Sequence, residues 1–173
     1  MSTPSPKSAS MPAAQPARLR AWLALGLLLL ASFAASAIGG LATAANVRTW
    51  YPTLVKPDWN PPSWVFGPVW TLLYILMAVA AWRVWRRRDV AGARAALLGH
   101  GLQLVLNAAW SLLFFGLHNP GAALIEIVVL WALLAWLFVR FRRIDPVAGW
   151  LWLPYLLWVS FATILNATIW YLN

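Results

Sequence analysis

Five long apolar segments, joined by short polar stretches, constrain this chain more than any other feature. They span about residues 21–45, 64–85, 95–117, 121–139 and 147–172. A helix needs about 20 such residues to cross the hydrocarbon core of a bilayer. Lipid offers the backbone no hydrogen bonds, which leaves helices and closed barrels, and the alternation typical of barrel strands is missing. The sequence therefore predicts an all-α membrane protein, a five-transmembrane-helix bundle.

Composition supports the same class. The chain is 62% hydrophobic and 10% charged, whereas soluble domains carry about 25% charged residues. A core of this size could not hide so much apolar surface from water. There is no cysteine, which excludes disulfides, thiolate metal ligands and cysteine nucleophiles.

The N-terminal region allows two interpretations. Residues 1–17 are rich in Ser, Pro and Ala and predict a disordered cytoplasmic tail, with residues 18–173 forming the membrane domain. Arg18 and Arg20 precede the first apolar run, and residues 35–37 (Ala-Ser-Ala) resemble a signal-peptidase site. The apolar character continues to Ala45, which is long enough for a retained helix. Local features leave both alternatives open.

The basic residues are placed asymmetrically. Of the 13 Lys and Arg residues, only Arg48 and Lys56 fall on the side of the bundle that carries the first loop. The others lie in the tail and in the second and fourth connections. The positive-inside rule then predicts a cytoplasmic N-terminus and a C-terminus outside. This placement explains the net charge of +9 without nucleic-acid binding.

The first connection, residues 46–63, is the long one. Its four prolines restrict the backbone, so we expect a stiff loop rather than a tether. It carries Trp50, Tyr51 and Trp59, which predict a lid over a pocket, with an interfacial aromatic belt as the alternative.

Three segments place aromatic residues beside polar or small ones on a single helical face. The third has Gln103, Asn107, Trp110 and Phe114, the fifth has Pro154, Trp158, Ala162 and Asn166, and the second has Phe66, Trp70 and Tyr74. Each face alone is compatible with helix packing, where amides bond neighbouring helices. Together they predict an apolar pocket with a few placed polar groups. Pro154 also predicts a kink.

Catalytic and metal-binding patterns are sparse. Glu126 is the one carboxylate within an apolar segment, and near the end of its span we expect it to reach the interface. His100 and His118 have no third ligand at metal-like spacing. We predict no catalytic residues, no metal site and no required cofactor.

Three motifs in order resemble a known family. They are WYPTLVKPDWNPPSWVFGPVWTLLY, then QLVLNAAWSLLFF, then PYLLWVSFATILN. The chain is similar, over about residues 22–172, to the TspO/MBR family of tryptophan-rich sensory and translocator proteins, which includes the peripheral-type benzodiazepine receptors. Because that family has five helices, the resemblance implies that the first segment is retained.

The resemblance implies a ligand and a site. Family members are commonly homodimers and bind porphyrins such as protoporphyrin IX and haem. The loop residues Trp50, Tyr51 and Trp59 would cap the pocket. Its lining would comprise Trp70, Gln103, Asn107, Trp110, Trp158, Ala162 and Asn166. A porphyrin ring suits tryptophan faces, and amides could bond its carboxylates or pyrrole nitrogens.

Animal members also bind cholesterol through a C-terminal pattern that ends in a basic residue. Here residues 171–173 are Tyr-Leu-Asn, so cholesterol is a doubtful ligand. We expect the bacterial cytoplasmic membrane rather than the outer membrane. The resemblance implies a tetrapyrrole-binding sensor or regulator in porphyrin metabolism or stress response, and no acid–base constellation in the sequence supports ordinary enzymatic turnover. The alternatives are a transporter of porphyrins or other small hydrophobic ligands and a light-dependent porphyrin-degrading enzyme.

Overall fold

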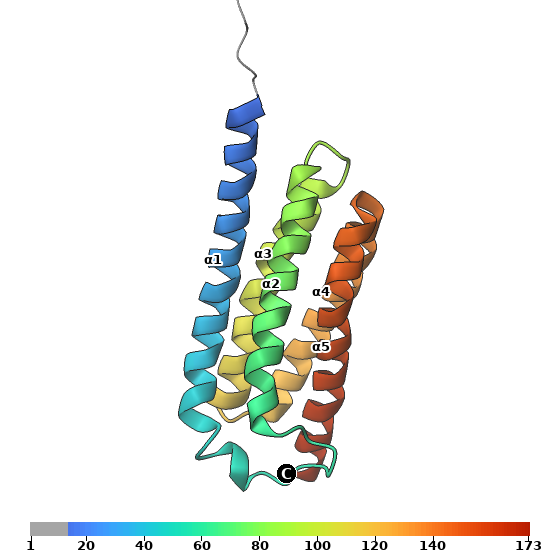
Figure 1. Cartoon of the computed structure of the whole chain (residues 1–173). Helices are drawn as coiled ribbons and strands as arrows, with labels where there is room; N and C mark the ends of the chain where they lie inside the picture. Colours follow the sequence, from blue (N-terminus) through green and yellow to red (C-terminus); the bar gives the residue numbers. More distant parts are fainter. Residues whose placement is uncertain (1–13) are drawn as a thin grey trace, which may run out of the picture.

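Long helices fill the computed structural model, which describes residues 14–173 (Figure 1). They are α1 (Ala14–Asn46), α2 (Phe66–Arg86), α3 (Ala93–Ser111), α4 (Pro120–Ile144) and α5 (Pro146–Leu172). Two 3-10 turns, η1 (Tyr51–Thr53) and η2 (Ser63–Val65), lie in the first loop, and a π-helical turn, η3 (Leu112–Gly116), extends α3. All five helices are long and apolar enough to cross a bilayer. The predicted five-helix membrane bundle is confirmed.

Two predicted boundaries differ from the structure. α1 begins at Ala14, so residues 14–17 of the expected tail are helical, while residues 1–13 lie outside the described part. α4 continues to Ile144, beyond the predicted end at residue 139. The sequence predicts a connection at Arg140, Arg142 and Arg143, where the structure has helix. The Arg140 guanidinium lies 5.3 Å from the Trp136 ring, a cation–π contact that keeps both side chains on the helix surface.

Asp145 holds the junction between α4 and α5. Its side chain accepts hydrogen bonds from the Val147 and Ala148 N–H groups and so caps α5. It also forms ion pairs with Arg83 at 3.0 Å and Arg87 at 3.3 Å, both on the last turn or C-terminal end of α2. One buried carboxylate thus connects three helices. We call this end of the bundle, which also carries the start of α1, the arginine-rich end (Figure 1).

α1 changes its partner along its length, and this opens space in the bundle. Near the arginine-rich end it packs on α2, where the Trp22 and Trp82 rings stack at 5.9 Å and Trp82 Nε1 donates to the Ala21 carbonyl. Toward the other end it packs on α3, where Gly39 lies so close to Ser111 that a Cβ would be 2.9 Å from its Oγ. α1 and α2 therefore border a cavity near the first loop.

Candidate functional site

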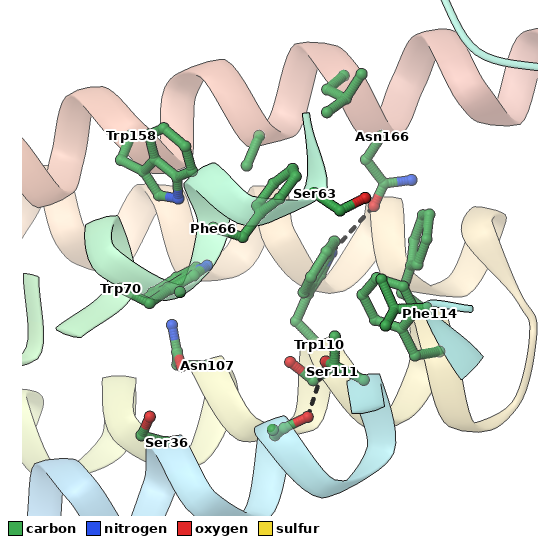
Figure 2. Close-up of a pocket in the computed structure, with 18 of the residues that line it drawn as sticks. Ser36, Ser63, Phe66, Trp70, Asn107, Trp110, Ser111, Phe114, Trp158 and Asn166 are labelled. Carbon is green, nitrogen blue, oxygen red and sulfur yellow. Dashed lines mark hydrogen bonds between the residues drawn. The ribbon is translucent and has the colours of Figure 1, made fainter. Parts of the chain in front are cut away.

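A cavity of about 670 Å³ lies within the half of the bundle that the first loop covers. Side chains of α1, α2, α3 and α5 line it, with two from α4 (Figure 2). The volume is within the ~300–1,000 Å³ typical of small-molecule pockets.

Aromatic rings form most of the wall. The Phe66 and Trp158 rings meet edge to face at 6.0 Å, and Trp70 packs on Tyr155 at 6.1 Å. Across the cavity the Trp110 ring stacks on Phe114 at 5.1 Å. Figure 2 shows Trp70 and Trp158 on one side and Trp110 on the other. Such contacts hold the rings in fixed orientations, so the cavity presents preformed flat apolar surfaces.

The deep end of the cavity is closed by a hydrogen-bonded chain of buried side chains. The Tyr74 hydroxyl donates to Asn107 Oδ1, and Asn107 Nδ2 donates to the Tyr155 hydroxyl at 3.0 Å. That hydroxyl donates to Gln103 Oε1 at 2.9 Å, and Gln103 Nε2 lies 3.3 Å from His100 Nδ1. Asn107 thus faces the cavity with both its side-chain oxygen and its side-chain nitrogen already in hydrogen bonds to protein.

A second amide near the lid is engaged in the same way. Asn166 Oδ1 accepts from Trp110 Nε1 at 3.0 Å, and its Nδ2 donates to the Pro120 carbonyl at 2.8 Å (Figure 2). The bonds join α5 to α3 and α4. Both cavity-lining amides therefore link helices through their oxygen and their nitrogen, and each keeps one further N–H donor.

The lid, residues 46–63, is shaped by internal polar contacts. Tyr51 is buried, and its hydroxyl donates to Asn60 Oδ1 at 2.7 Å. Burial raises the pKa of Tyr51. The Lys56 ammonium donates to the Tyr51 carbonyl at 2.8 Å, to that of Leu54 at 2.6 Å and to that of Pro52 at 3.4 Å. Lys56 holds the first turn of the lid together.

Two further contacts attach the lid to the bundle. The Trp50 ring stacks on His118 at 4.3 Å, and His118 Nε2 lies 2.9 Å from Asn46 Oδ1. At the other side the Asn173 amide pairs with both backbone groups of Val55, each at 3.0 Å. The predicted stiff loop is thus anchored at both the α3–α4 connection and the end of α5.

The structure brings together most of the residues that the sequence singled out. The cavity is lined by Tyr51, Trp70, Asn107, Trp110, Trp158, Ala162 and Asn166. Trp50 instead packs behind the wall, with its ring 5.6 Å from Phe114. Trp59 packs on Phe161 at 5.8 Å and is half exposed, and Gln103 lies beneath the cavity. These three do not line the cavity.

Sequence reasoning missed the contribution of α1. Ser36, Gly39, Gly40 and Thr43 line one side of the cavity, and Arg48 lies at its mouth. Gly39 also packs closely against Ser111 of α3. The sequence signal for this contribution was the run of small residues in α1, because small side chains leave room for a ligand as well as for a packed helix.

The prediction that the Glu126 carboxylate reaches the membrane interface is wrong. Both of its carboxylate oxygens are buried within the bundle and have no hydrogen-bond partner among the described residues, so it does not reach the interface. His100 Nε2 is likewise buried without a partner there. Within residues 14–173 no group of three His, Cys, Asp or Glu side chains could hold a metal ion.

Comparison with known proteins agrees with this architecture. The model of the TspO/MBR family matches residues 27–172. The chain is 42% identical to the tryptophan-rich protein TspO of Chlorobaculum tepidum, over 87% of this chain and 94% of that one. It is 41% identical to the tryptophan-rich sensory protein of Cereibacter sphaeroides (83% and 87%) and 36% identical to the translocator protein of Sus scrofa (86% and 89%). This membrane protein belongs to the TspO/MBR family.

Proposed function

We propose that this chain is an integral membrane receptor that binds a flat tetrapyrrole in its cavity and acts as a sensor or regulator. One observation carries the proposal: Trp70, Trp110 and Trp158 line a cavity of about 670 Å³ beneath an anchored lid. A large planar ring buries most apolar area against flat aromatic walls. The relatives named sensory and translocator proteins are consistent with a small-molecule ligand.

The closed end of the cavity favours binding over passage. Met77, Gln103 and Trp152 show no exposure beneath it, and the hydrogen-bonded chain from Tyr74 to His100 crosses the bundle there. A transporter would need a second route toward the arginine-rich end. The polar lining consists mainly of hydroxyls and amides, which orient a ligand rather than exchange protons with it. We therefore favour a receptor over a transporter or an enzyme.

We further propose that the arginine-rich end faces the cytoplasm of a bacterium and that the lid faces outward. Arginines at that end lie over tryptophan rings, as between Arg142 and Trp150 and between Arg86 and Trp82. Paired aromatic and basic side chains suit the headgroup region, and basic residues collect on the inner side. The homodimer that the family resemblance implies stays a prediction.

Titration of the purified protein in lipid nanodiscs with protoporphyrin IX tests the proposal. Binding is followed by the porphyrin absorbance band, because substitution of tryptophans alters protein fluorescence. We expect saturable binding at one site per chain. Trp158→Leu should weaken binding about 3- to 10-fold, since it removes a flat wall but keeps an apolar side chain.

Trp150→Leu is the matched control. Trp150 is 56% exposed on α5 and lies beside Arg142, far from the cavity. Its substitution should leave the dissociation constant unchanged. Non-saturable binding, or an equal loss in both variants, would refute a porphyrin site in this cavity.

A further inference from the structure

The mouth of the cavity carries a positively charged side chain to which the proposed function assigns no role. Arg48 lies two residues beyond the end of α1, lines the cavity and is exposed. Its guanidinium makes no ion pair with any residue in the range 14–173, where both ion pairs belong to Asp145 at the opposite end. A guanidinium beside an apolar cavity is well suited to a carboxylate.

The second basic residue of this end is not available to a ligand. Lys56 directs its ammonium at three lid carbonyls, which occupy its three donor hydrogens. Arg48 is therefore the one cationic group that borders the cavity within the described chain.

The deep part of the cavity has the opposite character. Asn107 is paired with Tyr74 and Tyr155, and Asn166 is paired with Trp110 and the Pro120 carbonyl. Thr43 and Thr71 donate to carbonyls of their own helices. An anion placed there would lose its hydration and meet only neutral groups, with no opposite charge to compensate it, which is costly. The cavity thus has a neutral aromatic interior and a cationic mouth.

We propose that Arg48 makes this pocket selective for amphiphiles with an anionic end, bound with the apolar body between the tryptophans and a carboxylate at the mouth. The inference rests on the proposed function and specifies which tetrapyrroles fit: those with carboxylates along one edge. It reverses the role expected of the amides, since the guanidinium rather than Asn107 or Asn166 receives the carboxylate.

A comparison of protoporphyrin IX with its neutral dimethyl ester tests this assignment. Affinities are measured in phosphatidylcholine nanodiscs for wild type, Arg48→Gln and Arg48→Lys. Both probes partition into the same bilayer in every sample, so partition cancels when the diacid-to-ester preference is compared between variants. The preference is the dissociation constant of the ester divided by that of the diacid. We expect this ratio to be about 10-fold larger in wild type than in Arg48→Gln.

Arg48→Lys should keep most of the preference, because it keeps the charge, while Arg48→Gln should bind the ester as wild type does. The matched control is Arg86→Gln, which removes a charge at the arginine-rich end and should leave the preference intact. An unchanged preference in Arg48→Gln, or equal weakening of both probes, would overturn the assignment. Failure of both probes to saturate wild type would instead reject the porphyrin site itself.

Discussion

Asn107 on α3 and Tyr155 on α5 form the central link of the hydrogen-bonded chain beneath the cavity. Asn107 Nδ2 donates to the tyrosine hydroxyl at 3.0 Å, and that hydroxyl donates to Gln103 at 2.9 Å. Tyr155 has no exposure. One hydroxyl on α5 therefore satisfies two buried amides on α3 and fixes the closed end of the cavity.

Tyr155→Phe removes that hydroxyl without changing the shape of the ring. Asn107 and Gln103 each lose a partner, and an unsatisfied buried group costs about 1–3 kcal/mol. We expect a clearly lower melting temperature in detergent. Tyr171→Phe is the control, because Tyr171 is 86% exposed. Equal melting temperatures for the two variants would show that the chain contributes nothing to stability.

The Asp145 junction should make stability depend on pH. Burial alone would raise the pKa of Asp145, but the Ala148 N–H bond and the charges of Arg83 and Arg87 outweigh it and hold the pKa below its ordinary value of 3.8. A lowered folded-state pKa stabilises the protein above the unfolded value, and that stabilisation is lost as the pH falls through the folded value. Wild type should therefore lose stability in acid.

Asp145→Asn separates the charge from the helix cap. Asparagine still caps α5 but cannot pair with the arginines, which are 29% and 51% exposed and so partly screened. We expect a loss of about 1–2 kcal/mol near neutral pH and a flatter acid dependence of the melting temperature. Asp89→Asn, at an exposed loop position, should behave as wild type. An acid profile in Asp145→Asn that matches wild type would disprove the role of this carboxylate.

The crossing of α4 and α5 tolerates no side chain at Gly149. A Cβ there would lie 2.6 Å from Arg142 Cβ and 2.8 Å from Arg142 Cα, so the helix backbones must separate. Gly149→Ala should cost about 1–3 kcal/mol. A Cβ added at Gly101 on α3 would have no atom within 4 Å, so Gly101→Ala should leave the stability unchanged or slightly higher. Thermal unfolding of both variants checks the contrast, and a stable Gly149→Ala protein would contradict this packing.

The sequence predicted much of this site because helical spacing gives direction reliably. Helical period identified the faces that carry Trp70, Asn107 and Trp158, the joint occurrence of these faces predicted a pocket, and all three residues line the cavity. Helical spacing does not show how far along the helix the cavity extends. Gln103 shares the face of Asn107 but lies one turn further in, where Tyr155 and Met77 surround its amide instead of a ligand space.

Irregular backbone was harder to predict than helix. Neighbouring lid residues have no fixed period, so nothing in the sequence shows that Tyr51 faces the cavity while Trp50 turns to His118. The contribution of α1 depends on its divergence from α2, which follows from packing of Gly39 against Ser111. Contacts between distant segments of this kind leave no local pattern.

The arrangement of Lys56 bears on how the protein can be handled. Amine-directed coupling, by which dyes are attached and proteins immobilised, converts a lysine ammonium into a neutral amide. At Lys56 that reaction would remove the donor group that binds the carbonyls of Tyr51, Pro52 and Leu54. Labelled material would therefore carry a loosened lid, and immobilisation through cysteines introduced at the arginine-rich end would preserve the native one.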